Sequence, residues 1–257
     1  MIQSVDRALR ILTVLQGARR LSLGELAVRL DLAPSTTHGI VRTLLAHGMV
    51  VQERDSQQYR LGPATLRMGN VYLDTLELRS RASTWAEDLA ARTGCAVRTG
   101  VRLFDDVVVV HHVPRPDGTR QMPEVGIVIP AHACALGKAL LAFDTTPPGD
   151  GARPPGRRMT GETVTDPAAF RAQLTEVRRT GIATEVEEAV LGECGAAAPL
   201  FDATGEVAGA IGLVTTATDW PLEPTALDAL RTAARAICRE LGAPAGLPAP
   251  ASPPATA

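Results

Sequence analysis

Residues 35–42 gather several side chains able to bind nucleic acid within about two helical turns. They supply hydroxyl groups, an imidazole and a guanidinium, which are the groups that bind base edges and phosphates. The expected DNA contacts in this segment are Ser35, Thr36, Thr37, His38 and Arg42. The alternative is that the Ser-Thr-Thr run only caps a helix and that Arg42 is a solvated surface charge.

Three short helices would position this cluster. An apolar residue recurs at helical spacing through residues 4–16, which predicts an amphipathic helix with Arg7 off its apolar side. The apolar positions are Val5, Leu9, Leu12 and Leu15. Ser22 and Glu25 form a capping box that begins a second helix. Pro34 opens a third helix that ends at Gly48, and this pair of helices is typical of a helix-turn-helix.

A β-hairpin is expected directly after the third helix. Residues 49–53 and 57–61 have the pattern of two strands, joined by a polar turn at 54–56. A hairpin in this place is a wing, which lies along the phosphate backbone or enters the minor groove. Its expected DNA contacts are Arg54, Gln57, Gln58 and Arg60. The sequence therefore predicts a winged helix-turn-helix domain over residues 1–62.

The charge of the chain is unevenly divided. The whole chain has a formal net charge of -2, yet residues 1–62 hold eight arginines against five acidic residues, a net charge of +3. The first domain is therefore expected to prefer a polyanion. No apolar run approaches the about 20 residues that a membrane span needs, and Met1 leads into a charged amphipathic segment. We expect a cytoplasmic protein without a membrane partner.

Four cysteines, at 95, 134, 194 and 238, lie far apart with no Cys-x-x-Cys pair. Their spacing argues against a zinc site, and free thiols fit a reducing compartment. We expect no metal and no cofactor.

Residues 63–92 keep a helical period without an internal proline, which predicts a linker of one long helix or two. Its apolar positions are Leu66, Gly69, Leu73, Leu76, Ala82, Trp85 and Leu89. We expect this face to form a homodimer, because one winged domain buries little surface on DNA. The alternative is that the helix packs on its own domain.

From Cys95 onward, short apolar runs with period two alternate with helical patterns. The expected strands are 96–103, 107–113, 126–129, 196–200 and 207–214, and the expected helices are 133–143, 167–180 and 223–241. This mixture predicts an α+β effector domain over residues 77–243, with a mainly antiparallel sheet flanked by helices. Residues 145–158 resemble a flexible loop, and residues 244–257 a disordered tail.

Several motifs, in this order and spacing, resemble the isocitrate lyase regulator (IclR) family over nearly the whole chain. They include Pro34-Ser35-Thr36-Thr37, Tyr59-Arg60-Leu61-Gly62, Pro130-Ala131-His132, Ala135-Leu136-Gly137-Lys138-Ala139, Thr163-Val164-Thr165-Asp166, Glu187-Glu188 and Ala197-Ala198-Pro199. Within the family, Val110-His111-His112-Val113 and Arg115-Pro116-Asp117 are most similar to the glycerol operon regulators.

The resemblance implies a transcriptional regulator with a GAF-like effector domain, forming dimers or dimers of dimers on an inverted-repeat operator. The implied effector is glycerol or its phosphate. We expect a repressor, with activation as the open alternative. The implied ligand-binding residues are Ala135, Leu136, Glu185, Cys194, Gly195, Gly212 and Val214. Backbone N–H groups at the start of the helix at 133–143 would suit a carboxylate, phosphate or hydroxyl.

Two further hypotheses come from other classes. An enzyme with a fused DNA-binding module could use Cys134 beside His132, but no third member of a catalytic set is recognisable, so we assign no catalytic residue. A winged-helix architectural protein would have no effector. We interpret His132 as a packing residue and Lys138 as a solvated charge or a fold contact. Of His111 and His112, alternation in a strand points one inward.

Overall fold

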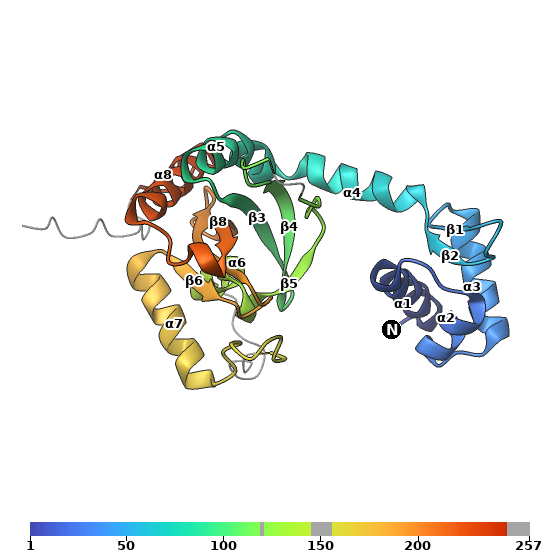
Figure 1. The fold of residues 1–257 in the computed structure, drawn as a ribbon. Coiled ribbons are helices and arrows are strands. Elements are labelled where there is room, and N and C mark those ends of the chain that lie inside the picture. Colours follow the sequence, from blue (N-terminus) through green and yellow to red (C-terminus); the bar gives the residue numbers. More distant parts are fainter. Residues whose placement is uncertain (119–120, 145–155, 246–257) are drawn as a thin grey trace, which may run out of the picture. The chain divides into compact units, whose positions relative to one another are not determined.

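The computed structural model describes residues 1–118, 121–144 and 156–245. The chain divides into two compact units, Met1–Thr75 and Leu76–Ala257 (Figure 1). The loop predicted over 145–158 and the tail predicted over 244–257 lie outside the described residues, except at 156–158 and 244–245.

The first unit is a three-helix bundle followed by a two-stranded hairpin. Its elements are α1 (Gln3–Ala18), α2 (Leu23–Leu30), α3 (Pro34–Ala46), β1 (Val50–Gln52), β2 (Tyr59–Leu61) and α4 (Pro63–Thr75). The strands pair antiparallel, with Val51 opposite Arg60. Residues from all three helices and from the hairpin, among them Ile11, Leu26, Val41 and Val50, form one buried core. The helix-turn-helix and the wing were therefore correctly predicted, although each strand is shorter than expected.

Local signals set the ends of α2 and α3. The Ser22 hydroxyl accepts a hydrogen bond from the Glu25 N–H, and the Glu25 carboxylate accepts one from the Ser22 N–H at 2.7 Å, so the predicted capping box is present. Pro34 opens α3, where its missing N–H is not needed. Gly48 follows with a φ of +67°, which only glycine adopts without strain.

The apolar side of α1 differs from the prediction. Ile11 and Leu15 are buried, whereas Val5 and Leu9 are 52% and 58% exposed. The helix carries apolar residues on more than one side, and only the side bearing Ile11 and Leu15 meets the core of this unit.

The predicted linker is two helices, α4 and α5 (Glu77–Thr93), with Leu76 between them. No residue of α4 is buried, and Leu66, Met68, Val71 and Tyr72 expose their apolar side chains. In contrast, α5 buries Ala82 and Leu89 against its own domain, where it packs on α8 and β3. The dimer face predicted for Ala82 and Leu89 is therefore wrong, because these side chains belong to an intramolecular core.

The second unit is an α+β domain. Among the described residues, six strands form one antiparallel sheet in the order β5-β4-β3-β8-β7-β6. They are β3 (Ala96–Leu103), β4 (Asp106–Val113), β5 (Val128–Pro130), β6 (Ala183–Val186), β7 (Glu193–Phe201) and β8 (Val207–Thr216). The sequence predicted all of them except β6.

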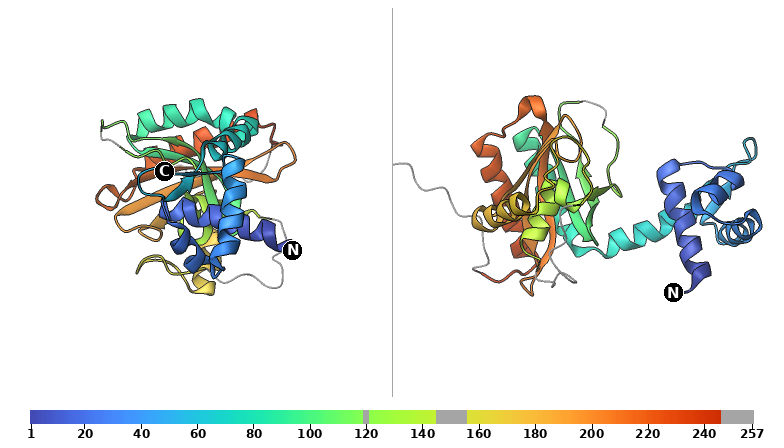
Figure 2. Two further views of the ribbon diagram at one scale, coloured as in Figure 1. Left: turned by 90° about the vertical axis from the view of Figure 1, so that its right-hand side faces the viewer. Right: turned by 90° about the horizontal axis from the view of Figure 1, so that it is seen from below.

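Helices cover both faces of this sheet (Figures 1 and 2). On one face lie α5 and α8 (Pro224–Glu240), and on the other α6 (Ala135–Ala142) with α7 (Pro167–Thr180) beside it. Two 3-10 turns, Ala131–Ala133 and Ala217–Asp219, complete the described elements. None of the described helices is long and apolar enough to span a membrane.

Candidate DNA interface and effector site

The first turns of α3 present an open polar surface. Ser35, His38 and Arg42 are exposed, and Thr36 is half-buried. The helix reaches this position because α2 and α3 pack together across the tight turn at residues 31–33. An exposed helix front with hydroxyl, imidazole and guanidinium groups has the chemistry that base edges and phosphates require.

Thr37 does not belong to this surface. Its side chain is 0% exposed, and its hydroxyl donates a hydrogen bond to the Ala33 carbonyl at 3.2 Å. The prediction that Thr37 contacts DNA is therefore wrong. The spacing of Thr37, Val41 and Leu44 would have revealed this, because positions i, i+4 and i+7 share one helix face.

Of the predicted wing residues, Arg54, Gln57 and Arg60 are exposed and Gln58 is half-buried. Two of them have partners within the hairpin. The Gln57 amide donates to the Arg54 carbonyl at 2.7 Å, and Arg60 pairs with Glu53 at 3.3 Å.

Arg20, which the sequence reasoning missed, pairs with the same Glu53 carboxylate at 3.2 Å, beside Arg60. Arg7 on α1 is half-buried. Arg54 is an exposed cation of the wing and forms no ion pair with a residue that the structure describes.

Most of the predicted effector residues come together where α6 packs on the sheet. Glu185 pairs with Gly195, and Gly195 with Val214, so these three share one face of the sheet. A Cβ built on Gly195 would lie 3.9 Å from Ala135 Cβ, and one built on Gly212 would lie 3.3 Å from Leu136 Cδ2. The two glycines therefore face the start of α6.

Cys194 is the exception among these residues. It precedes Gly195 in β7 and pairs with Val186 and Thr215, so alternation directs its thiol to the opposite face of the sheet. The prediction that the Cys194 side chain lines the same site is therefore wrong.

Glu185 is a buried carboxyl, 5% exposed. Burial, followed by the charge of Glu193, raises its pKa to about 8. The carboxyl accepts a hydrogen bond from the Glu188 N–H at 3.2 Å. Near neutral pH it is protonated, so it can also donate a hydrogen bond.

A second ionisable group on this face, Arg98, was missed. Arg98 pairs with Gly212 in the sheet. Its Nη1 donates to Glu193 at 2.6 Å, and its Nη2 donates to Glu124 at 2.9 Å and to Glu193 at 2.8 Å. Its Nε also donates to Glu124. Burial alone would lower the pKa of Arg98, but these hydrogen bonds raise it, so the guanidinium remains charged.

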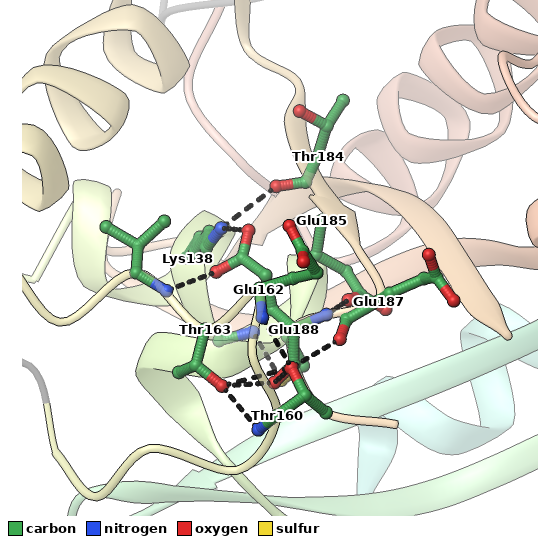
Figure 3. A network of polar contacts seen from close by, with 11 residues as sticks. Lys138, Thr160, Glu162, Thr163, Thr184, Glu185, Glu187 and Glu188 are labelled. Carbon is green, nitrogen blue, oxygen red and sulfur yellow. Dashed lines mark hydrogen bonds and ion pairs between the residues drawn. The ribbon is translucent and has the colours of Figure 1, made fainter. Parts of the chain in front are cut away.

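Lys138 is fully buried in a network that joins α6 to β6 and to the segment 160–164 (Figure 3). Its Nζ donates to Glu188 Oε1 at 2.5 Å and to the Thr184 carbonyl at 3.2 Å. The Thr163 hydroxyl donates to the Glu188 carbonyl oxygen at 2.7 Å. Lys138 is therefore a fold contact, and the interpretation as a solvated charge is wrong.

The pair considered for catalysis is arranged for packing. The Cys134 thiol caps α6 by accepting a hydrogen bond from the Gly137 N–H at 3.3 Å, and burial raises its pKa to about 12. His132 is buried, with Nε2 at 3.2 Å from the Arg157 carbonyl oxygen, and burial lowers its pKa. A thiol that keeps its proton at neutral pH is a poor nucleophile.

His111 and His112 point to opposite faces of the sheet, as alternation predicts. His112 pairs with Arg98 in the sheet, and its Nε2 lies 3.4 Å from the Glu124 carboxylate. The His111 imidazole interacts electrostatically with Arg79 and Glu87 on α5. Burial lowers the pKa of both imidazoles.

A cavity of about 350 Å³ lies elsewhere in this unit and contains none of the predicted ligand residues. Cys95, Arg115, Thr215 and Asp219 are among the residues that line it. No group of three or more potential metal ligands occurs in the part of the chain that the structure describes.

Comparison with known proteins accounts for both units. Residues 4–54 match the IclR helix-turn-helix domain, and residues 70–239 match the bacterial transcriptional regulator IclR C-terminal domain. The chain is 41% identical over 247 residues to the glycerol operon regulatory protein of Streptomyces coelicolor, covering 94% of this chain and 97% of that protein. It is 33% identical to the HTH-type transcriptional regulator BhcR of Paracoccus denitrificans, covering 82% and 77% of the two chains.

Solved structures share the fold. An IclR transcriptional regulator from Silicibacter sp. TM1040 superposes with a TM-score of 0.81 at 26% identity, covering 96% of this chain and 100% of that one. An IclR homologue from Microbacterium hydrocarbonoxydans, solved with 4-hydroxybenzoate, gives a TM-score of 0.75 at 24% identity, covering 93% and 99%. The two domain matches and the long alignments agree with the helix-turn-helix and the sheet described above, and the chain belongs to the IclR family of transcriptional regulators.

Proposed function

We propose that the protein is a dimeric repressor of genes for the use of glycerol. In this proposal it binds an inverted-repeat operator through α3 and the wing, and a small molecule on the α6 face of the sheet changes its affinity for DNA. The observation that carries the proposal is the 41% identity to glycerol operon regulatory proteins over 94% of the chain, which spans both units. Glycerol and its phosphate are the two candidate effectors.

The surface of the first unit supports binding to the operator. Ser35, His38 and Arg42 stand exposed on the front of α3, and Arg54 stands exposed on the wing. Residues of the recognition helix would contact bases, while the wing would contact the phosphate backbone. A repressor that contacts an operator acts where the chromosome is, so we place this bacterial protein in the cytoplasm.

The exposed apolar residues of α4 support a dimer. Met68, Val71 and Tyr72 share one side of the helix and are each at least half exposed, whereas Leu66, also exposed, lies on the opposite side. An exposed apolar patch often marks an interaction site, and a second copy of α4 would cover Met68, Val71 and Tyr72. Two winged domains would then bind two half-sites and roughly double the DNA interface.

The small residues and the buried carboxyl on the α6 face support an effector site there. Gly195, Gly212 and Ala135 limit side-chain volume beside Glu185. A ligand that stabilises one arrangement of the two DNA-binding domains would change operator affinity by its differential affinity for the two arrangements.

An enzyme using Cys134 and His132 is disfavoured as the alternative. The Cys134 thiol is buried with a pKa of about 12 and serves as a helix cap. The relatives reported above are transcriptional regulators.

The operator interface is tested with the full-length protein and the DNA upstream of its own gene, followed by fluorescence anisotropy. Arg42→Ala should weaken binding by about 1 to 3 kcal/mol if Arg42 contacts a base, or lower the salt dependence by about one unit of slope if it contacts a phosphate. The matched control is Arg171→Ala, an exposed arginine on α7, which should leave both quantities unchanged. Unchanged affinity and slope in Arg42→Ala would remove Arg42 from the interface.

A further inference from the structure

Two cations are buried where α6 packs on the sheet, and carboxylates already pair with both. Arg98 makes four hydrogen bonds to the carboxylates of Glu124 and Glu193, which use most of the five N–H donors of a guanidinium. Lys138 pairs with Glu188 and also donates to a backbone carbonyl. Around the predicted effector residues, two cations are thus matched by three carboxylates.

Glu185 lies between these two groups. Its carboxyl interacts electrostatically with Glu193 on β7, Glu188 after β6 and Lys138 on α6. The Cys134 thiol at the start of α6 interacts in the same way with Glu185, Arg98 and Lys138. A neutral Glu185 carboxyl offers one donor and an acceptor without adding a charge. This matches the hydroxyl group, which also donates and accepts.

Gly195 allows close packing next to this carboxyl. A Cβ on Gly195 would lie 2.9 Å from the Leu213 carbonyl oxygen, which is too close for a larger residue, and 3.7 Å from Glu185 Oε1 and 3.9 Å from Ala135 Cβ. The carboxyl, the start of α6 and Gly195 therefore meet at one point on the face of the sheet.

We infer that the ligand of this face is an uncharged polyol and that its phosphate ester is excluded. The inference rests on the proposed function, because it takes the α6 face as the effector site. A phosphate monoester carries a charge of about -1.5 to -2 near pH 7 and would enter a region where carboxylates already outnumber cations. Burying a charge without a partner is costly, whereas a hydroxyl needs only hydrogen bonds.

The start of α6 does not decide between the two ligands. Backbone N–H groups at a helix N-terminus can donate hydrogen bonds to a hydroxyl oxygen or to a phosphate oxygen with the same geometry. The discriminating groups are Glu193 and Glu124, which neutralise Arg98 and leave no unpaired cation for the ester.

The first test measures release of the full-length protein from its upstream DNA by glycerol, by glycerol 3-phosphate and by inorganic phosphate, at one pH and ionic strength. We expect glycerol to release the protein and glycerol 3-phosphate to fail at the same concentration. If only the ester releases the protein, the charge inference is wrong, while the proposed repressor stands with glycerol phosphate as its effector. If neither compound acts, both the inference and the proposed effector are wrong.

The second test removes one of the negative charges that pair with Arg98. Glu193→Gln keeps the shape and a hydrogen-bond acceptor but removes one negative charge, so calorimetric affinity for glycerol 3-phosphate should rise at least tenfold relative to glycerol. Glu176→Gln, on the surface of α7, is the matched control and should leave the ratio unchanged. An unchanged ratio in Glu193→Gln would overturn the inference. Thermal unfolding checks that Glu193→Gln is folded. If it is not, Glu124→Gln serves instead, because it also removes one negative charge beside Arg98.

Discussion

Removal of the Lys138 ammonium should destabilise the second unit strongly. Lys138 is 0% exposed and Glu188 is 5% exposed, with Nζ and Oε1 at 2.5 Å. In Lys138→Met the methionine fills much of the same volume, but the Glu188 carboxylate stays buried without its cation. Breaking a buried ion pair by removing one partner costs about 3 to 5 kcal/mol.

The surrounding hydrogen bonds set where in that range the cost falls. Glu188 Oε2 also accepts from the Val164 N–H at 3.4 Å, a long contact that compensates little, and Lys138→Met also leaves the Thr184 carbonyl without its donor. Both considerations place the loss near the upper end, at about 4 to 5 kcal/mol. The double variant Lys138→Met with Glu188→Gln removes the unpaired charge and should recover at least half of the loss.

Urea unfolding followed by tryptophan fluorescence measures this loss selectively. Both tryptophans, Trp85 and Trp220, lie in the second unit, so their emission reports on that unit. The control is Arg179→Met, which breaks another ion pair with a 2.5 Å distance, to Glu176, but on the exposed surface of α7. The control should not change the midpoint measurably, because solvent screens an exposed pair. If Lys138→Met is as stable as wild type, the interpretation of Lys138 as a fold contact is refuted.

Two further predictions concern pH and assembly. Burial raises the pKa of the Glu185 carboxyl to about 8 in the folded protein, whereas the same carboxyl in the unfolded chain ionises above about pH 4.5. Between these values the folded state binds the proton more tightly. The contribution of Glu185 to stability therefore falls as pH rises from about 5 to 8. The difference in unfolding free energy between Glu185→Gln and wild type, measured at the same pH, should therefore increase over that window and level off above it. A difference that does not change with pH would contradict the raised pKa of Glu185. In the dimer, Met68→Glu on α4 should shift the sedimenting species towards monomer, whereas Asn70→Glu, an exposed position on the opposite side of the helix, should not. A dimer that persists unchanged in Met68→Glu would place the interface elsewhere.

The helix-turn-helix was predictable because its signals are local. A capping box at Ser22 and Glu25, a proline at the start of α3 and a glycine after it each define an end within a few residues. The one error in that cluster, Thr37, arose from judging the side chain by its polarity instead of its place in the helical period. A hydroxyl that bonds to its own helix can be buried without penalty.

Strand β6 could not be found by its pattern, because it is short and burial in its second half is the reverse of hydropathy. Glu185 points inward while Val186 is 41% exposed. Only the buried network around Lys138 and the Glu188 N–H explains why a carboxyl occupies an inward position there.

The cluster around Arg98 could not be predicted from the sequence for another reason. Its partners Glu124 and Glu193 lie 26 and 95 residues further along the chain. An arginine inside an apolar strand is an indication that a buried carboxylate exists, but no local spacing identifies which one. The fold brings the three together because β7, which carries Glu193, lies one strand beyond β8, and because the segment before β5, which carries Glu124, runs beside β4.

The central claim, that the front of α3 lies against operator DNA, is tested most directly by cleavage from a tethered reagent. An iron chelate is attached at Ser35→Cys in a protein whose partly exposed Cys238 is replaced by serine, and Thr175→Cys on α7 serves as the control attachment site. The account predicts two clusters of strand breaks related by the symmetry of the operator from Ser35→Cys, and background cleavage from Thr175→Cys. Specific binding with no cleavage above background from Ser35→Cys would contradict it.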